Sequence, residues 1–464
     1  MRRTFLLIAA AWIAALVTGS TPALAATHTQ SFRYPVSMDP YEVKQQISLA
    51  HTPEVDGFIT AMSVNVVDAN DRAVPIKRLM LHHIVFVSLN RPNPMCQSFT
   101  GFDSRSYPYS NAELFYGAGE ERNRLVLPNG YGYPIKKSDK YWGMVWMLMN
   151  HRGAADHAFI RYTVTWDDAT DLTPVHPYWL DVRNCRADPV FDVPGGGKKG
   201  STDKQRYTYR MPESGRIVAG GGHVHGGAKN LTVSEPDCAN RTVFVSRPAW
   251  GTRKHPFYHV RPILHEPGPI SMSGMLSQKG YPIRQGERIR LTSTYDNQRP
   301  HTRVMGISVV YVAPDSTVGK CAPTPDDQQF IQPAKLLGVP FRKHTPRFTV
   351  PLTGLNANGK AVSIKRPPGK TVAVKSGHRI EVADFLFHEP NVSVKPGSTL
   401  RWMFGTSTIH NVTLANGPRG FSSPNLNADP SAPRSFKFKF KKAGTYRIFC
   451  ALHPTQMSET VTVK

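Results

Sequence analysis

The sequence has 464 residues, with 57 Lys and Arg against 33 Asp and Glu, which gives a formal net charge of +24 at pH 7. The basic residues are dispersed, and no basic motif interleaved with aromatic residues is present, which argues against a nucleic-acid-binding module. The 36 Gly and 39 Pro along the chain favour short strands and many turns over long helices. We therefore expect a solvated basic surface that attracts a cell wall, an anionic lipid or an acidic partner, and no nucleic-acid partner.

Residues 1–25 have the pattern of a secretory signal peptide. Two arginines precede an apolar run that ends at the small-residue exit Ala23-Leu24-Ala25, which predicts cleavage before Ala26. The apolar run is short and interrupted by polar residues and a proline, so an N-terminal membrane anchor is the weaker alternative. We expect a secreted or extracytoplasmic protein, at the cell surface or in the periplasm.

The odd number of cysteines is informative in an exported protein, where disulfides are permitted. Two bridges among the first four would leave the fifth, Cys450, unpaired, and the sequence leaves all three pairings of those four open. The cysteines are Cys96, Cys185, Cys238, Cys321 and Cys450.

The next elements in chain order are strands. Runs rich in β-branched and aromatic residues recur between turn formers at 79–89, 140–151, 158–166, 231–234, 242–246, 288–295 and 306–312. No helix longer than two turns is predicted before residue 325. The loop-like composition of 166–206 marks a seam, so we expect two successive jelly-roll-like β-sandwiches, at 28–165 and 166–317.

A Pro- and Lys-rich connector is predicted over 318–369, followed by a third β-domain over 370–464. Residues 436–441 alternate Phe and Lys, which is the period of a half-exposed strand with its phenylalanines turned inward. The expected fold class is therefore all-β throughout.

The segment "FCALHPTQM" at 449–457 places Cys450, His453 and Met457 in one short loop between two predicted strands, and His410 lies 40 positions before Cys450. By itself, Cys450 has three possible roles: half of a disulfide, a catalytic thiol or a metal ligand. Cysteine parity disfavours the disulfide. A thiolate and two imidazoles with a weak axial thioether form the ligand set of a blue-copper centre.

With these residues in this order, 370–464 resembles a cupredoxin of the plastocyanin and pseudoazurin type. The resemblance implies a Greek-key β-sandwich that binds one type 1 copper and transfers electrons. It implies that the ligands are His410, Cys450, His453 and Met457, with the ring edge of His453 as the usual exit for the electron.

Histidines in the larger block form three features: His82 with His83, His151, and His223 with His225 in "GGGHVHGG". Alternate residues of a strand share a face, so His223 and His225 can chelate one ion. Adjacent residues point to opposite faces, so His82 and His83 share an ion only at a strand end or distortion.

The order of these features, with Met305 on a later strand, resembles the core of the copper type II, ascorbate-dependent monooxygenases (the peptidylglycine α-hydroxylating and dopamine β-monooxygenase type). The resemblance implies two type 2 coppers, one in each sandwich. His82, His83 and His151 would hold the copper that stores an electron. His223, His225 and Met305 would form the catalytic copper site that hydroxylates a substrate C–H bond with dioxygen, and an external reductant such as ascorbate or a redox protein would supply electrons.

Three positions depart from the peptide-amidating members of that family. Gly221 replaces the arginine that grips the substrate carboxylate, and Ile307 and Val309 replace an asparagine and a tyrosine. Recognition of a peptidyl-glycine is therefore not supported, and the substrate, a small molecule or a peptide, is left open. Four other histidines are expected to be structural or surface residues: His255, His259, His265 and His301.

The sequence thus predicts an exported copper monooxygenase with a fused type 1 copper domain that feeds it electrons. The alternative is a non-catalytic copper-binding or electron-transfer protein. A multicopper oxidase is disfavoured because its trinuclear cluster needs several HxH pairs and the sequence has one.

Overall fold

The computed structural model describes residues 26–96, 111–430 and 433–464, so the predicted signal peptide lies outside the described residues. The described chain is nearly all β, as expected, with one short 3₁₀ helix, η1 (Pro256–His259), and one short α-helix, α1 (Pro333–Leu336). Among these residues, no helix has both the length and the hydropathy required to cross a bilayer.

The first sandwich packs a six-stranded sheet against a four-stranded sheet. Strand β9 alternates buried positions with more exposed, mostly half-buried ones along its length, as a strand with one face on a core does. The first sheet has the order β1 (Thr27–Met38), β9 (Asp156–Asp167), β3 (Gly57–Val67), β7 (Tyr131–Ile135), β10 (Thr173–Pro174), with β6 (Leu125–Val126) beside β3. The second has the order β2 (Val43–His51), β8 (Tyr141–Asn150), β4 (Leu79–Pro92), β5 (Ala112–Gly119).

The second sandwich begins at β11, since β10 still pairs with β7 of the first sandwich. One sheet has the order β11 (His176–Asp181), β22 (Gly306–Pro314), β14 (Gly215–Val224), β19 (Gly274–Ile283), β23 (Gln329–Ile331). The other has the order β13 (Thr202–Arg210), β20 (Arg288–Asp296), β15 (Ala228–Glu235), β16 (Arg241–Ser246). Two small sheets complete it: β12 (Phe191–Val193) with β21 (His301–Val304), and β18 (Ser271–Met272), β17 (Pro248–Gly251), β24 (Phe341–Arg342).

The connector is partly built into the second sandwich, because β23 pairs with β19 and β24 pairs with β17. It then forms a hairpin of β25 (Leu352–Leu355) and β26 (Ala361–Ile364). Two disulfides, Cys96–Cys185 and Cys238–Cys321, use the first four cysteines, and Cys450 is free and buried. The parity argument is thereby confirmed.

The C-terminal sandwich has its own core around the fully buried Trp402. The predicted Phe/Lys alternation is confirmed, because Phe440 is buried, Phe436 and Phe438 are half-buried and the lysines between them are exposed. One sheet has the order β27 (Val372–Ala373), β30 (Asn391–Val394), β35 (Ser458–Val463), β34 (Gly444–Phe449), β32 (Thr413–Asn416). The other has the order β29 (Leu386–Phe387), β28 (Arg379–Ala383), β31 (Thr399–Phe404), β33 (Ser435–Lys439).

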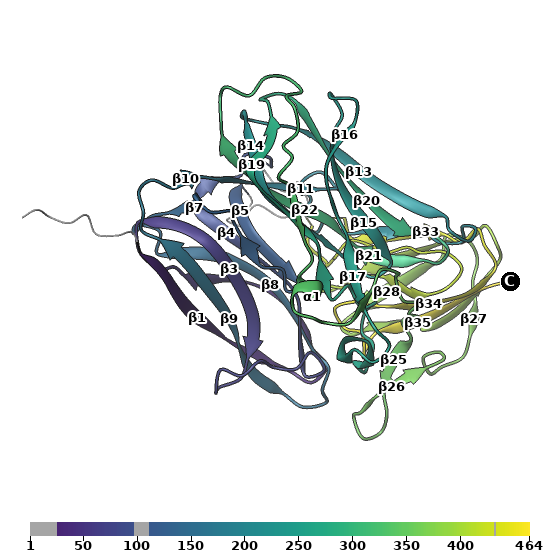
Figure 1. The fold of residues 1–464 in the computed structure, drawn as a ribbon. Coiled ribbons are helices and arrows are strands. Elements are labelled where there is room, and N and C mark those ends of the chain that lie inside the picture. Colours follow the sequence, from purple (N-terminus) through teal and green to yellow (C-terminus); the bar gives the residue numbers. More distant parts are fainter. Residues whose placement is uncertain (1–25, 97–110, 431–432) are drawn as a thin grey trace, which may run out of the picture.

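The three sandwiches pack against one another, with the first drawn in purple and blue, the second in teal and the C-terminal one in yellow (Figure 1). A small apolar cluster lies where they meet. It contains Met80 and Met147 of the first sandwich and Leu264 of the second, and Leu452 of the C-terminal sandwich packs against it. Leu452 belongs to the loop that carries Cys450 and His453, so this loop faces the centre of the molecule.

Candidate metal centres

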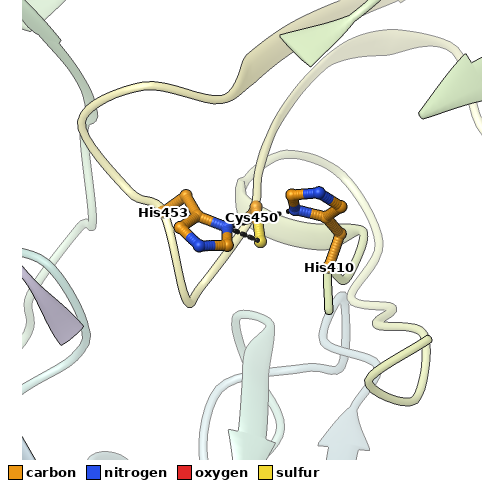
Figure 2. A group of neighbouring side chains, drawn as sticks. All are labelled: His410, Cys450 and His453. Carbon is orange, nitrogen blue, oxygen red and sulfur yellow. Dashed lines mark hydrogen bonds between the residues drawn. The ribbon is translucent and has the colours of Figure 1, made fainter. Parts of the chain in front are cut away.

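The C-terminal centre brings together two imidazoles and a thiol from two segments that are distant in sequence. His410 lies just before β32, and Cys450 and His453 follow the end of β34 (Figure 2). The Nδ1 atoms of His410 and His453 are 3.1 Å apart, and Cys450 Sγ lies 3.5 Å from His453 Nδ1. These three donor atoms lie within 4.8 Å of one another. Met457 is fully buried in the same core cluster as Cys450.

Backbone hydrogen bonds hold the ligand loop closed. The Cys450 N–H donates to Met457 O (3.1 Å), and the Met457 N–H donates to His453 O (3.0 Å). The Asn411 N–H donates to Cys450 Sγ (3.4 Å), while Asn411 Oδ1 accepts from the Ala451 N–H (2.8 Å). The predicted ligands are therefore gathered and oriented by a fixed second layer of contacts. This donor set, with soft sulfur and two ring nitrogens, fits a type 1 copper.

Copper uptake by this centre should weaken as the pH falls. Burial raises the pKa of the Cys450 thiol above its ordinary value, so below that pKa copper must displace a proton to bind the sulfur. Burial and the neighbouring His410 lower the pKa of His453 to about 4, so a second proton competes only below that pH. We expect the apparent copper affinity, measured by competition with a chelator, to fall about tenfold per pH unit between pH 7 and 5. An affinity independent of pH in that range would contradict the prediction.

His223 and His225 form the second group of converging donors. Their Nε2 atoms face each other at 3.1 Å. The Nδ1 of His223 bonds to Glu121 (3.0 Å), and the Nδ1 of His225 bonds to the carbonyl of Arg303 (3.0 Å). In metal sites the outer ring nitrogen of a histidine ligand is held in this way by a carboxylate or a backbone carbonyl. The sequence prediction that these two side chains can chelate one ion is therefore consistent with how their rings are oriented.

Backbone features allow this approach. A Cβ atom on Gly119 would lie 2.4 Å from Cε1 of His223, so the glycine makes room for the ring. The hydroxyl of Tyr295 donates to Met305 O (2.6 Å) and accepts from the His225 N–H (2.9 Å), which joins Met305 to the histidine pair through one side chain. Met305 is buried and lines the same cavity as His223 and His225.

His82 and His83 lie at a distortion of β4. Leu81 pairs with Leu148 of β8 and His83 with Met147, so His82 is the extra residue of a β-bulge. The ring centroids of His82 and His83 are 5.2 Å apart. Two adjacent histidines can face one ion only at a strand end or a distortion, and this bulge is such a distortion.

His151, the third residue predicted for this site, bonds to the backbone of the second sandwich and lies within electrostatic range of His265 and Glu120. Its Nδ1 bonds to Pro262 O (3.0 Å), and its Nε2 is buried without a partner. Among the described residues, no hydrogen bond or ring contact joins His151 to His82 or His83. His82 instead contacts histidines of the second sandwich, with ring centroids 5.0 Å from His225 and 4.8 Å from His265.

Sequence reasoning missed two members of this cluster, Glu120 and His265. Glu120 Oε1 lies 2.8 Å from His82 Nδ1 and also bonds to His265 Nε2. The other unassigned histidines have structural contacts, as expected. His255 caps η1, His259 bonds to Arg253 O and His301 pairs with Glu266.

A cavity of about 680 Å³ joins the two groups of donors. Its wall includes His82, His223 and His225 from the first two sandwiches. It also includes Ala451 and Leu452, which lie between Cys450 and His453 in the C-terminal ligand loop. The cavity therefore reaches from the N-terminal histidines to the backbone of the C-terminal centre.

Comparison with protein families identifies two parts of the chain. Residues 374–464 match the family described as copper binding proteins, plastocyanin/azurin family. Residues 148–315, the end of the first sandwich and most of the second, match the family described as Stress up-regulated Nod 19.

Two curated relatives agree with the first match. Amicyanin-alpha of Methylorubrum extorquens is 27% identical over 112 residues, which cover 24% of this chain and 86% of that protein. Amicyanin of Paracoccus versutus is 25% identical over 118 residues, covering 25% and 86%. A reduced amicyanin mutant of known structure is 26% identical, covering 19% of this chain and 81% of its own, with a TM-score of 0.17. An oxidised mutant is 25% identical, covering 20% and 86%, also with a TM-score of 0.17.

Proposed function

We propose that the whole chain is an exported copper-dependent monooxygenase. In this proposal the C-terminal sandwich, a cupredoxin domain of the copper-binding, electron-transfer type, passes electrons to a histidine centre between the two N-terminal sandwiches. The observation that carries the proposal is the cavity, because it connects the cupredoxin ligand loop with His223 and His225. An electron carrier that works only through its outer surface has no need of such a cavity.

The residues at the cavity fit copper. His223 and His225 offer two Nε2 donors whose outer nitrogens are anchored, and buried Met305 adds a soft thioether, which favours Cu(I). Copper held there would supply one-electron steps and a place for dioxygen to be reduced. The proposed reaction inserts one oxygen atom into a substrate C–H bond and releases the other as water. It consumes two protons and two electrons, which come from ascorbate or a redox protein.

The cavity wall suits a largely apolar substrate. Met147, Leu276 and Val309 line it, and a Cβ atom built on Gly221 meets no heavy atom within 4 Å, so this position leaves open space. These apolar residues would exclude water from the reacting C–H bond, while the anchored rings of His223 and His225 fix where oxygen is reduced.

Arg303 links the two centres by hydrogen bonds and supports the proposed transfer. Its carbonyl accepts from His225 Nδ1, and its guanidinium donates to the carbonyl of Ser423 in the cupredoxin domain (3.1 Å). Ser423 Oγ accepts a hydrogen bond from the Val412 N–H (2.9 Å). The residue before Val412 is Asn411, whose N–H donates to Cys450 Sγ. A continuous covalent and hydrogen-bonded route therefore runs from Cys450 to His225. The backbone of Arg303 adopts φ 51°, a left-handed conformation that is uncommon for residues other than glycine.

Arg303→Ala should slow electron transfer between the centres without changing either ligand set. The lost bond to Ser423 costs the interface about 1.5–3 kcal/mol, as a hydrogen bond from a charged group does. We expect the reoxidised variant to have a blue band of parental intensity. The rate at which oxygen reoxidises the reduced variant, measured by stopped flow, should fall several-fold. Arg419→Ala is the matched control, since Arg419 makes one bond across the same interface, to Gly195 O (2.8 Å), away from His225. Equal rates for both variants would exclude the Arg303 route.

Copper counting and oxygen uptake test the proposal itself. The loaded protein should hold three coppers per chain, one with intense blue absorption and two with type 2 spectra, and should consume oxygen with ascorbate and a turned-over substrate. One copper per chain would overturn the N-terminal copper sites. Three coppers with no substrate-dependent oxygen uptake would favour the second candidate, a copper-binding electron-transfer protein. Ile307 and Val309, which stand in place of polar substrate-binding residues, also favour this candidate.

We also propose that the protein works outside the cytoplasm and associates with an anionic surface. The two disulfides suit an oxidising environment outside the cytoplasm. The net charge of +24 suits association with an anionic cell surface.

A further inference from the structure

Three side chains from three separate segments converge beside the His223–His225 pair. His82 comes from the bulge in β4, Glu120 follows the end of β5, and His265 lies in the segment between η1 and β18. Their donor atoms lie within 4.8 Å of one another. Two of these segments belong to the first sandwich and one to the second, so the group lies at the interface between the two sandwiches.

The carboxylate of Glu120 is held by a backbone contact on its far side. Glu120 Oε2 accepts from the Gly268 N–H (2.9 Å), which leaves Oε1 facing the two rings. The side chain of Glu120 is 5% exposed and that of His82 9% exposed. The imidazole rings approach with different atoms, Nδ1 of His82 and Nε2 of His265, so they converge on the carboxylate from two directions.

A hydrogen-bonded His–Glu–His group alone leaves polar groups without partners. Among the residues that the structure describes, Nδ1 of His265 is buried with no hydrogen-bond partner, and the same is true of Nδ1 of the neighbouring His83. Two carboxylates, Glu120 and Glu121, are buried in this cluster, and each bonds to at least one imidazole. A divalent cation would balance that buried negative charge.

From this convergence we propose that His82, Glu120 and His265 bind a divalent transition-metal ion, in a site adjoining the His223–His225 pair. Two imidazoles and one carboxylate suit several first-row metals, and copper(II) binds such sites most tightly. His82 and His225 are in ring contact, so the two N-terminal ions would be neighbours across the sandwich interface. This assignment rests on the proposed function and deepens it, because it adds His265 and Glu120 to the centre that was predicted to consist of His82, His83 and His151.

Copper binding to single-site variants tests the assignment. The full chain, its variants Glu120→Gln and His265→Ala, and the control Glu213→Gln are loaded with copper(II) sulfate by dialysis, and copper per chain is measured. Glu213 is a matched control because it also bonds to a histidine, His176 (2.8 Å), but has no second histidine. We expect each test variant to hold one copper fewer than the parent chain, with about 100-fold or greater loss of affinity at that site, and the control to hold the full number.

Two further measurements keep the result decisive. The blue band and the thermal unfolding midpoint report whether a variant is folded. If His265→Ala does not fold, the test rests on Glu120→Gln, which keeps the shape of the side chain. The proposal is overturned if Glu120→Gln keeps the full copper content with parental affinity, or if His83→Ala and His151→Ala lose the ion instead. Failure of the monooxygenase proposal would look different: full copper loading with no substrate-dependent oxygen uptake.

Discussion

Cys450→Ser is expected to abolish the blue absorption and the type 1 copper signal of the protein. The intense colour of such centres comes from the copper–thiolate bond, and the hydroxyl of serine does not replace a thiolate as a soft ligand. Cys450 is fully buried and its sulfur accepts a hydrogen bond from Asn411, so the serine hydroxyl would also sit in the domain core. We expect a stability cost of about 1–3 kcal/mol for that polar group.

The measurement is the visible spectrum and copper content of the variant beside Met457→Leu. Met457 is buried in the same core, and leucine conserves its volume, so that variant should fold with a cost below about 1.5 kcal/mol. It should keep a blue band and have a higher reduction potential, because the oxidised copper loses a weak axial donor. A blue band that survives Cys450→Ser would show that Cys450 is not the ligand. Loss of the band in both variants would instead point to a collapse of the loop.

The convergence of the C-terminal candidate ligands was predictable from sequence because three of the four lie in one loop. Cys450, His453 and Met457 lie within eight positions, so local spacing alone constrains their geometry. Only His410 requires a long-range contact, and a strand end with a histidine was enough to indicate it. The strands were predictable for a similar reason, since period and composition are local properties. The runs at 140–151 and 158–166 correspond to β8 and β9.

The N-terminal cluster was only partly predictable because it depends on register and on packing between sandwiches. His82 meets Glu120 across 38 residues and Glu120 meets His265 across 145 residues. The sequence around His265 has no repeated spacing that would mark a ligand. The bulge at His82 likewise arises from how β4 pairs with β8, which the amino-acid pattern of β4 does not encode by itself. Contact between His82 and His225 follows from the docking of two domains, a level that motif spacing does not reach.

The second large effect is expected from His225→Ala. The imidazole of His225 contacts three features at once: its Nε2 faces His223, its Nδ1 bonds to the Arg303 carbonyl, and its ring lies against His82. Alanine leaves His223 as a lone nitrogen donor of the pair and breaks the hydrogen-bonded route from Cys450. We therefore expect at least one type 2 copper to be lost and substrate-dependent oxygen uptake to fall about 100-fold or more. This loss of activity is larger than the loss typical of removing a residue that only orients a metal ligand.

The cupredoxin domain should be unaffected in this variant. Its copper ligands have their own core and loop contacts, so the blue band and its reduction by ascorbate should match those of the parent chain. His259→Ala is the matched control, because His259 is an exposed histidine whose ring, among the described residues, bonds to Arg253 O (2.7 Å) and to no other group. If His225→Ala consumed oxygen at the parental rate with the substrate, the site of oxygen reduction would lie elsewhere. If it lost oxygen uptake but kept both type 2 coppers, the role of His225 would be confined to the electron route through Arg303.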